Sequence, residues 1–202
     1  MTKIKLCGLS RLCDIEAANE LKPEYIGFVF APGSRRYVSP EKAAELKRRL
    51  DPAIRAIGVF VNEAPTTIAR LLNDRVIDAA QLHGSEQESD IKRLRSLTGK
   101  PIIQAFRIGC MQDIVAAERS AADFILLDSG GGTGIQFDWG LIRSIQRPYF
   151  LAGGLSVANA PLAVRMLHPY AVDVSSGIET DGKKDPNKMA AFVAAVRKEE
   201  TI

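Results

Sequence analysis

Reactive side chains stand at the ends of several short apolar runs in this sequence. Cys7 ends the first run, His83 follows Ala79–Leu82, and Asp128 follows Phe124–Leu127. A thiol and a carboxyl on separate segments suffice for general acid–base catalysis, with no metal and no hydride carrier. The apolar segment before Asp128 can desolvate that carboxyl. These residues are therefore candidates for an active site.

Small residues follow the last two apolar runs. Gly153 and Gly154 follow one of them, and Ser175, Ser176 and Gly177 follow the other. Glycine lets backbone N–H groups approach an anion closely, and serine hydroxyls add hydrogen-bond donors. The two motifs together predict a phosphate-binding site. The alternative is that these glycines only form tight turns.

The apolar runs alternate with amphipathic segments along the whole chain of 202 residues. Continuous apolar runs are typical of parallel strands covered on both faces, and the intervening stripes follow helical spacing. Eight such units favour a single-domain (β/α)8 TIM barrel over residues 1–202, rather than an open doubly wound sheet. The expected strands are Ile4–Cys7, Tyr25–Phe30, Ile54–Val61, Ala79–Leu82, Pro101–Phe106, Phe124–Leu127, Tyr149–Ala152 and Ala171–Val174.

This architecture explains why the reactive residues share one kind of position. Barrels of this class carry their active sites at the carboxyl ends of the strands, often with a phosphate site after strands seven and eight. The last helix is expected to close the ring by packing against the first. The glycine-rich segment 130–134 is interpreted as a mobile active-site loop rather than a phosphate cradle.

Helix starts are marked by capping residues. Ser39 followed by Pro40 predicts an N-cap with proline at the first helical position. Ser85 is a second candidate cap because Glu88 stands three residues later. Asp138 is a third.

Strand alternation puts Lys3, Lys5 and Cys7 on one face of the first strand. If that face is the barrel lumen, Lys5 lies one layer below the thiol and beside the eighth strand. We therefore predict an ion pair between Lys5 and Asp173, and we expect the nearby cation to help Cys7 lose its proton. The alternative is that Lys5 points outward between helices.

The composition excludes several classes of function. The net charge is +3 and the basic residues are scattered, which argues against a nucleic-acid partner or an anionic membrane. There is no apolar run long enough for a membrane span, and the N-terminal segment lacks the features of a signal peptide, so we expect a cytoplasmic location. Monomer and homodimer are both open. A disulfide framework or a structural metal site is not expected from the spacing of Cys7, Cys13, Cys110, His83 and His168.

A series of short motifs extends from residue 3 to about residue 185. It reads Lys5-Leu6-Cys7-Gly8, Gly27-Phe28-Val29-Phe30, Ser34-Arg35-Arg36-Tyr37-Val38-Ser39-Pro40, Gly58-Val59-Phe60-Val61-Asn62, Gln81-Leu82-His83-Gly84, Leu127-Asp128, Phe137-Asp138-Trp139, Ala152-Gly153-Gly154-Leu155 and Val172-Asp173-Val174-Ser175-Ser176-Gly177-Ile178-Glu179. In type and order these motifs strongly resemble the phosphoribosylanthranilate isomerase family.

The resemblance implies a (β/α)8 barrel of tryptophan biosynthesis that works without a cofactor. Its reaction converts N-(5-phosphoribosyl)anthranilate to 1-(2-carboxyphenylamino)-1-deoxyribulose 5-phosphate by an Amadori rearrangement, so its partner is a small-molecule phosphosugar. The resemblance implies Cys7 as general base, Asp128 as general acid and Arg36 on the anthranilate carboxylate, which a planar guanidinium suits. We also expect Asp173 and His83 at the substrate site. His83 either orients substrate or holds a loop.

Two competing interpretations have weaker support. The related isomerase family of histidine biosynthesis uses paired aspartates at strands one and six, and Cys7 occupies the first of these positions here. A phosphosugar-binding regulator on the same fold would not need both Cys7 and Asp128.

Overall fold

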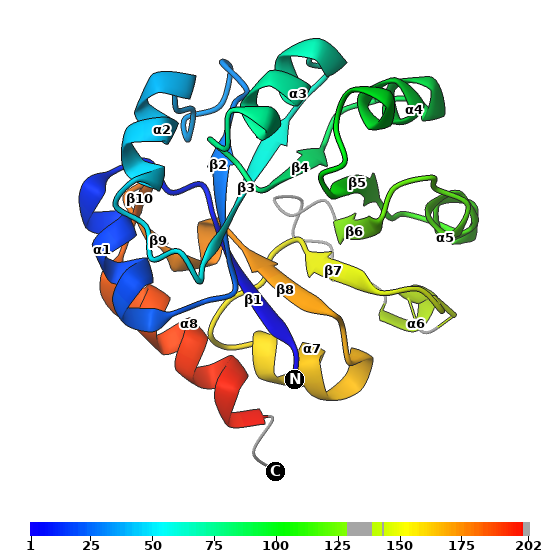
Figure 1. Ribbon diagram of the computed structural model, residues 1–202. Helices are drawn as coiled ribbons and strands as arrows, with labels where there is room; N and C mark the ends of the chain where they lie inside the picture. Colours follow the sequence, from blue (N-terminus) through cyan, green and yellow to red (C-terminus); the bar gives the residue numbers. More distant parts are fainter. Residues whose placement is uncertain (129–138, 143, 200–202) are drawn as a thin grey trace.

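Eight parallel strands close into a barrel in chain order, and the last strand pairs with the first. The computed structural model describes residues 1–128, 139–142 and 144–199. Figure 1 looks into the barrel, with the helices arranged around the outside of the strands. The strands are β1 (Lys3–Cys7), β2 (Tyr25–Val29), β3 (Arg55–Phe60), β4 (Ala79–Leu82), β5 (Ile102–Arg107), β6 (Phe124–Asp128), β7 (Tyr149–Ala152) and β8 (Ala171–Val174). The predicted TIM barrel is confirmed.

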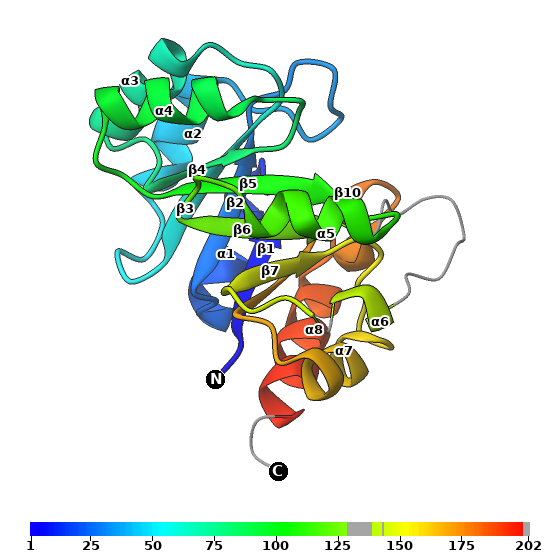
Figure 2. The same ribbon diagram turned by 90° about the vertical axis from the view of Figure 1, so that its right-hand side faces the viewer.

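The helices that cover the barrel are α1 (Leu12–Leu21), α2 (Pro40–Lys47), α3 (Pro65–Asn73), α4 (Glu88–Leu97), α5 (Met111–Glu118), α6 (Trp139–Ile142), α7 (Ala160–Leu167) and α8 (Pro186–Glu199). Helix α8 packs against both α1 and α7, as expected for ring closure. Figure 2 shows the barrel from the side, with α5 lying outside β5 and β6. No helix in the described ranges has the length and apolar character that crossing a bilayer requires.

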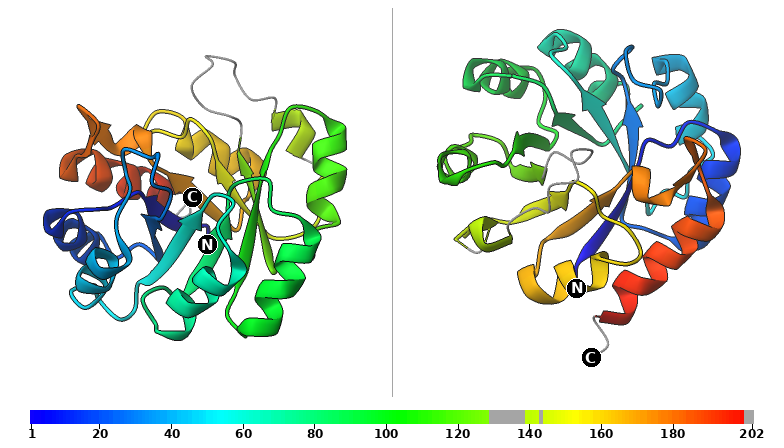
Figure 3. Two further views of the ribbon diagram at one scale, coloured as in Figure 1. Left: turned by 90° about the horizontal axis from the view of Figure 1, so that it is seen from above. Right: turned by 180° about the vertical axis from the view of Figure 1, so that it is seen from behind.

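The connection between β8 and α8 contains further structure. A short 3-10 helix, η1 (Ser176–Ile178), leads into a two-stranded hairpin of β9 (Glu179–Thr180) and β10 (Lys183–Lys184). The hairpin turns at Asp181 and Gly182, whose φ angles are 50° and 74°. Both panels of Figure 3 show this orange segment beside the N-terminal part of the chain. It brings residues from the end of the chain to the carboxyl end of β1.

The predicted strand boundaries all lie within one residue of those observed. The Ser39 cap is confirmed, because its side chain accepts a hydrogen bond from the backbone N–H of Lys42. The Ser85 cap is wrong. Helix α4 has Gln87 at its N-cap, and the Ser85 N–H and hydroxyl instead face the Asn62 amide oxygen. The segment 130–134 and Asp138 lie outside the described residues.

Alternation along each strand divides the apolar residues between two cores. On β1, Ile4 and Leu6 belong to the large core between strands and helices, whereas Lys5 and Cys7 face the lumen. The amino-terminal part of the lumen is filled by apolar side chains, with Phe150 in ring contact with its aromatic neighbours. The lumen is therefore closed at that end, and it opens at the carboxyl ends of the strands.

Candidate active site

A cavity of ≈ 560 Å³ lies at the carboxyl ends of the strands. It collects side chains that are far apart in the sequence, as the barrel prediction required. Nine of the predicted site residues line it: Cys7, Arg36, His83, Asp128, Gly153, Gly154, Asp173, Ser175 and Ser176. Gly177 is the remaining predicted residue, and it does not line the cavity.

The predicted ion pair between Lys5 and Asp173 is confirmed. The two residues are register partners on β1 and β8, and Lys5 Nζ lies 2.8 Å from Asp173 Oδ2. The Lys5 side chain is fully buried, which disfavours its charge. The carboxylate of Asp173 and the thiol of Cys7 outweigh that burial, so the net effect raises the pKa of Lys5. Lys5 is thus a fixed positive charge in the lumen.

The Cys7 thiol lies at the end of β1 and is almost completely buried. Burial raises the pKa of Cys7, and the positive charges of Lys5 and Lys184 reverse only part of that increase. The predicted lowering of the Cys7 pKa by a nearby cation is therefore present, but the opposite effect of burial on that pKa is larger. Gly27 makes room for the sulfur, because a Cβ at that position would lie 2.6 Å from Sγ.

Asp128 ends β6 on the other side of the cavity and is partly exposed to it. His83 Nε2 lies 3.5 Å from Asp128 Oδ2. On its other side, His83 Nδ1 lies 2.7 Å from Gln81 Nε2. The ring of His83 is thus held between the carboxyl and a buried amide, and both contacts lie at the cavity rather than in a remote loop.

Gln81 belongs to the motif Gln81-Leu82-His83-Gly84 but was not predicted as a site residue. It is almost fully buried on β4, and its Oε1 accepts a hydrogen bond of 2.8 Å from Lys5 Nζ. The signal that could have found it is alternation, since Ala79, Gln81 and His83 share one face. A polar amide on a lumen-facing position between two apolar residues requires a buried partner.

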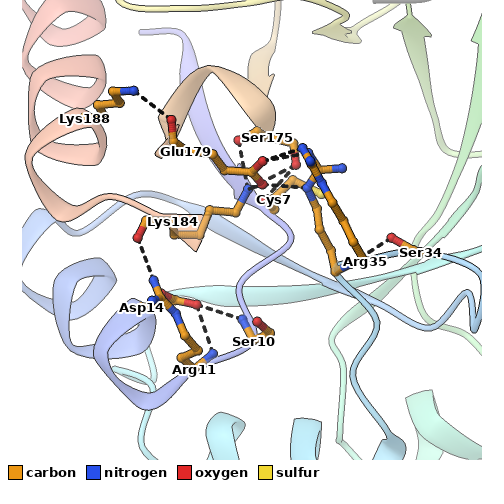
Figure 4. Close-up of polar contacts among 11 residues, drawn as sticks. Cys7, Ser10, Arg11, Asp14, Ser34, Arg35, Ser175, Glu179, Lys184 and Lys188 are labelled. Atoms are coloured by element: carbon orange, nitrogen blue, oxygen red, sulfur yellow. Dashed lines mark hydrogen bonds and ion pairs between the residues drawn. The ribbon is translucent and has the colours of Figure 1, made fainter. Parts of the chain in front are cut away.

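Glu179 was also missed as a site residue, and it determines how Arg36 is held. Arg36 Nε and Nη2 donate to the two carboxylate oxygens of Glu179, at 2.6 and 2.9 Å. Arg35 and Lys184 donate to the same carboxylate, at 2.8 and 2.7 Å. In Figure 4, Glu179 and Lys184 lie on the hairpin, and Arg35 lies on the loop after β2.

The charge state of this cluster follows from its partners. Burial opposes the charge of Glu179, but hydrogen bonds from Arg36 and Lys184 lower its pKa to about 2. The same carboxylate raises the pKa of Arg36. Burial lowers the pKa of Lys184, and Glu179 opposes that decrease. The buried carboxylate of Glu179 thus binds three cationic side chains beside the cavity, those of Arg35, Arg36 and Lys184.

Gly8 allows Arg36 to cross the end of β1. Its φ is +81°, and a Cβ there would lie 2.5 Å from Cδ of Arg36. The guanidinium of Arg36 uses its Nε and Nη2 side for Glu179, and no partner of Nη1 lies among the described residues. Arg36 therefore keeps donor capacity on the side away from Glu179.

The loops after β7 and β8 lie against each other. Gly153 and Gly154 have φ angles of 89° and 64°. A Cβ on Gly177 would lie 2.0 Å from the carbonyl oxygen of Leu155, so this glycine permits the loop contact. Ser175 Oγ donates to the carbonyl of Cys7 at 3.1 Å. The two predicted phosphate motifs are therefore brought together, with Gly177 behind the cavity wall.

Within residues 1–128, 139–142 and 144–199, no group of three or more His, Cys, Asp or Glu side chains is arranged to hold a metal ion.

Comparison with known proteins gives one consistent result. The sequence profile of the N-(5'phosphoribosyl)anthranilate (PRA) isomerase family matches residues 4–195. The N-(5'-phosphoribosyl)anthranilate isomerase of Endomicrobium trichonymphae is 44% identical over 202 residues, covering 98% of this chain and 99% of the relative. The crystal structure of phosphoribosyl anthranilate isomerase from Thermotoga maritima superposes with a TM-score of 0.90 at 35% identity, covering 98% and 100%.

A second crystal structure in this group contains a ligand. It is a phosphoribosyl anthranilate isomerase in complex with reduced 1-(o-carboxyphenylamino)-1-deoxyribulose 5-phosphate. It matches with a TM-score of 0.88 at 35% identity, and the match covers 98% of this chain and 100% of that one.

Proposed function

The chain belongs to the N-(5'-phosphoribosyl)anthranilate isomerase family, and we propose that Cys7 and Asp128 carry out the proton transfers of its reaction. That reaction is an aldose–ketose isomerisation in tryptophan biosynthesis. It converts N-(5-phosphoribosyl)anthranilate to 1-(2-carboxyphenylamino)-1-deoxyribulose 5-phosphate by an Amadori rearrangement. The observation that carries the residue assignment is that a thiol from β1 and a carboxyl from β6 line the same cavity.

Asp128 is the proposed general acid for ring opening. Its proton passes to the furanose ring oxygen, the bond between that oxygen and C1′ breaks, and the bond's electron pair stays on the oxygen. The lone pair of the anthranilate nitrogen forms the C1′=N bond, which leaves a positive iminium. Asp128 is accessible from the cavity, as an acid that must reach substrate has to be.

Cys7 is the proposed general base for the second step. The thiolate removes the proton from C2′, the electrons form the C1′=C2′ bond, and the iminium electrons return to nitrogen. The resulting enolamine becomes the ketone when C1′ takes a proton from the Cys7 thiol and the 2′-hydroxyl gives its proton to the Asp128 carboxylate, so that the thiolate and the acid are regenerated. Burial raises the pKa of Cys7, so we propose that the thiol first loses its proton to solvent water, and that Lys5, Lys184 and the positive iminium stabilise the thiolate. The base then acts after ring opening.

Substrate binding is assigned to the groups around these two. We propose that Arg36 pairs with the anthranilate carboxylate through the donors that Glu179 leaves available. The loops with Gly153, Gly154, Ser175 and Ser176 are proposed for the phosphate, with Gly177 allowing their close packing.

Asp173 is proposed to contact a hydroxyl of the sugar. Its Oδ2 accepts from Lys5, whereas its buried Oδ1 has no hydrogen-bond partner among the described residues. A buried acceptor at a cavity wall is stabilised when a ligand donates to it. This supports a substrate-binding role beyond the ion pair.

The experiment is a steady-state assay of phosphoribosylanthranilate consumption followed by anthranilate fluorescence. Cys7→Ser and Asp128→Asn should each lower kcat on the order of 10²–10⁴-fold with a modest change in KM, because each removes one proton-transfer group. Near wild-type turnover in purified Asp128→Asn would refute the assigned acid. Near wild-type turnover in Cys7→Ser would refute the assigned base.

Three broader expectations are also proposals. We propose that residues 1–202 form one catalytic domain, that the enzyme works in the cytoplasm, and that it is a monomer or a homodimer. Light scattering on the purified chain gives the oligomeric state, cell fractionation gives the location, and limited proteolysis reports whether the chain is cleaved into separately folded parts.

A further inference from the structure

A continuous set of polar contacts crosses the lumen between the two proposed catalytic groups. Asp173 accepts from Lys5 at 2.8 Å, and Lys5 donates to Gln81 Oε1 at 2.8 Å. Gln81 Nε2 lies 2.7 Å from His83 Nδ1, and His83 Nε2 lies 3.5 Å from Asp128 Oδ2. The contacts connect β8, β1, β4 and β6. Asp173 and Lys5, at one end of this set, lie beside the thiol of Cys7. Asp128, the proposed acid, is the other end.

Lys5 determines which way the amide of Gln81 points. An ammonium group has only donors, so the Gln81 atom that faces it must be the oxygen. Lys5 is fully buried and paired with Asp173, so it is held in this position. A flipped amide would place its NH₂ group against the ammonium, leaving two donors in contact. The amide NH₂ of Gln81 is therefore directed at His83.

The amide in turn determines where His83 carries its proton. Gln81 Nε2 donates, so His83 Nδ1 must accept and cannot hold a hydrogen. A neutral imidazole with a bare Nδ1 carries its proton on Nε2, the atom that faces Asp128. The tautomer with hydrogen on Nδ1, and the doubly protonated ring, would each bring an N–H against the amide NH₂.

We propose that Gln81 is a positioning residue that holds His83 as the Nε2–H tautomer, so that His83 stabilises the Asp128 carboxylate left after ring opening. A bare Nε2 would instead be able to take the proton of Asp128, which would compete with transfer to substrate. The Nε2–H donor cannot accept that proton. It strengthens its interaction as negative charge develops on the carboxylate, and catalytic hydrogen bonds often shorten once substrate is bound. The inference rests on the proposed role of Asp128.

Gln81→Glu is the sharpest variant because it keeps the shape and replaces the NH₂ donor by a negatively charged carboxylate oxygen that can only accept. The new carboxylate still accepts from Lys5, but its second oxygen now requires a hydrogen on His83 Nδ1. The tautomer should therefore change while the barrel stays intact. The chain has only two histidines, His83 and His168. His168 is a helix C-cap with φ 44°, a conformation that Asn also accepts, so His168→Asn leaves one imidazole to observe.

The first measurement is the ¹⁵N NMR spectrum of the His168→Asn protein labelled at histidine. We expect a pyridine-like shift for Nδ1 and a pyrrole-like shift for Nε2, and the reverse assignment in Gln81→Glu. The second measurement is kinetic. Gln81→Glu should lower kcat on the order of 10²-fold, with KM changed by less than about threefold, because one donor to the acid is lost. His83→Gln, whose amide can still donate to Asp128, should keep more kcat than His83→Leu.

The possible outcomes separate the two proposals. A proton on Nδ1 in the His168→Asn protein would overturn the role of Gln81, whatever the variants do, including a case in which Gln81→Glu does not fold. A changed tautomer in Gln81→Glu with kcat within about twofold would overturn its catalytic importance. Full activity of Asp128→Asn would instead refute the assigned acid, while the NMR result on the tautomer would stand.

Discussion

Lys5 and Asp173 form a buried ion pair between the first and the last strand of the barrel, with Lys5 Nζ 2.8 Å from Asp173 Oδ2. Cys7 lies two residues beyond Lys5 on the same face of β1. The pair therefore places a fixed positive charge below the thiol, at the seam where the barrel closes. The contribution of this charge to the pKa of the Cys7 thiol can be measured.

Lys5→Met should raise the pKa of Cys7 further, because it removes the cation with the larger of the two effects that oppose burial. The thiolate fraction can be followed by its ultraviolet absorbance against pH, in a Cys13→Ser/Cys110→Ser background that removes the two exposed thiols. The variant leaves Asp173 buried and unpaired, so we expect a loss of stability of about 3–5 kcal/mol. Adding Asp173→Asn should recover part of that stability. An unchanged thiol pKa would remove Lys5 from the account of activation.

Arg36→Met should raise KM on the order of 10–10²-fold, because a charge-assisted contact with the substrate carboxylate is lost. The discriminating substrate is the aniline analogue, which lacks that carboxylate. Wild type and variant should differ little on the analogue and strongly on the natural substrate. Arg93→Met, on an exposed position of α4, is the matched control. An unaltered KM and kcat for Arg36→Met would refute the carboxylate contact.

Glu179→Gln should change how stability depends on acid. The folded-state pKa of Glu179 is about 2, below its ordinary value of 4.5. The unfolded chain therefore binds more protons between these values, and the stability supplied by Glu179 is lost as pH falls from about 4.5 to about 2. Urea unfolding at several pH values should show a shallower acid decrease in Glu179→Gln than in wild type. Parallel curves for the two proteins would contradict the assigned charge state.

Gly27→Ala should impair activity by displacing the thiol, because the new Cβ would lie 2.6 Å from Cys7 Sγ and 3.1 Å from Cys7 Cα. Overpacking of this kind costs about 1–3 kcal/mol in stability, and a displaced base lowers kcat more than it raises KM. Gly33→Ala is the control, since a Cβ there meets no atom within 4 Å. Equal kcat values for the two variants would show that Gly27 is not needed for the position of the sulfur.

Much of the framework could be predicted because it depends on local pattern. Continuous apolar runs define the strands, and alternation along β1 places Lys5 and Cys7 in the lumen. The partner of Lys5 followed once the ring was assumed to close, since β8 then becomes its neighbour. The Ser85 cap failed because a tertiary contact with Asn62 uses the polar groups of Ser85.

The parts of the site that escaped prediction depend on contacts between distant segments. Glu179 is 143 residues from Arg36 in sequence, and Gln81 is 76 residues from Lys5. No periodicity connects such pairs. The direction of the Cys7 pKa shift also could not be predicted from the sequence, because it depends on whether burial or the neighbouring cations have the larger effect.

The hairpin after β8 has a consequence for how the enzyme becomes active during synthesis. It carries Glu179 and Lys184, while β8 itself supplies the partner of Lys5. A growing chain that has not yet released this segment from the ribosome holds a cationic lumen without its counter-charge and an Arg36 without its anchor. Catalytic competence must therefore wait until this hairpin has left the ribosome and the last strand has joined the first.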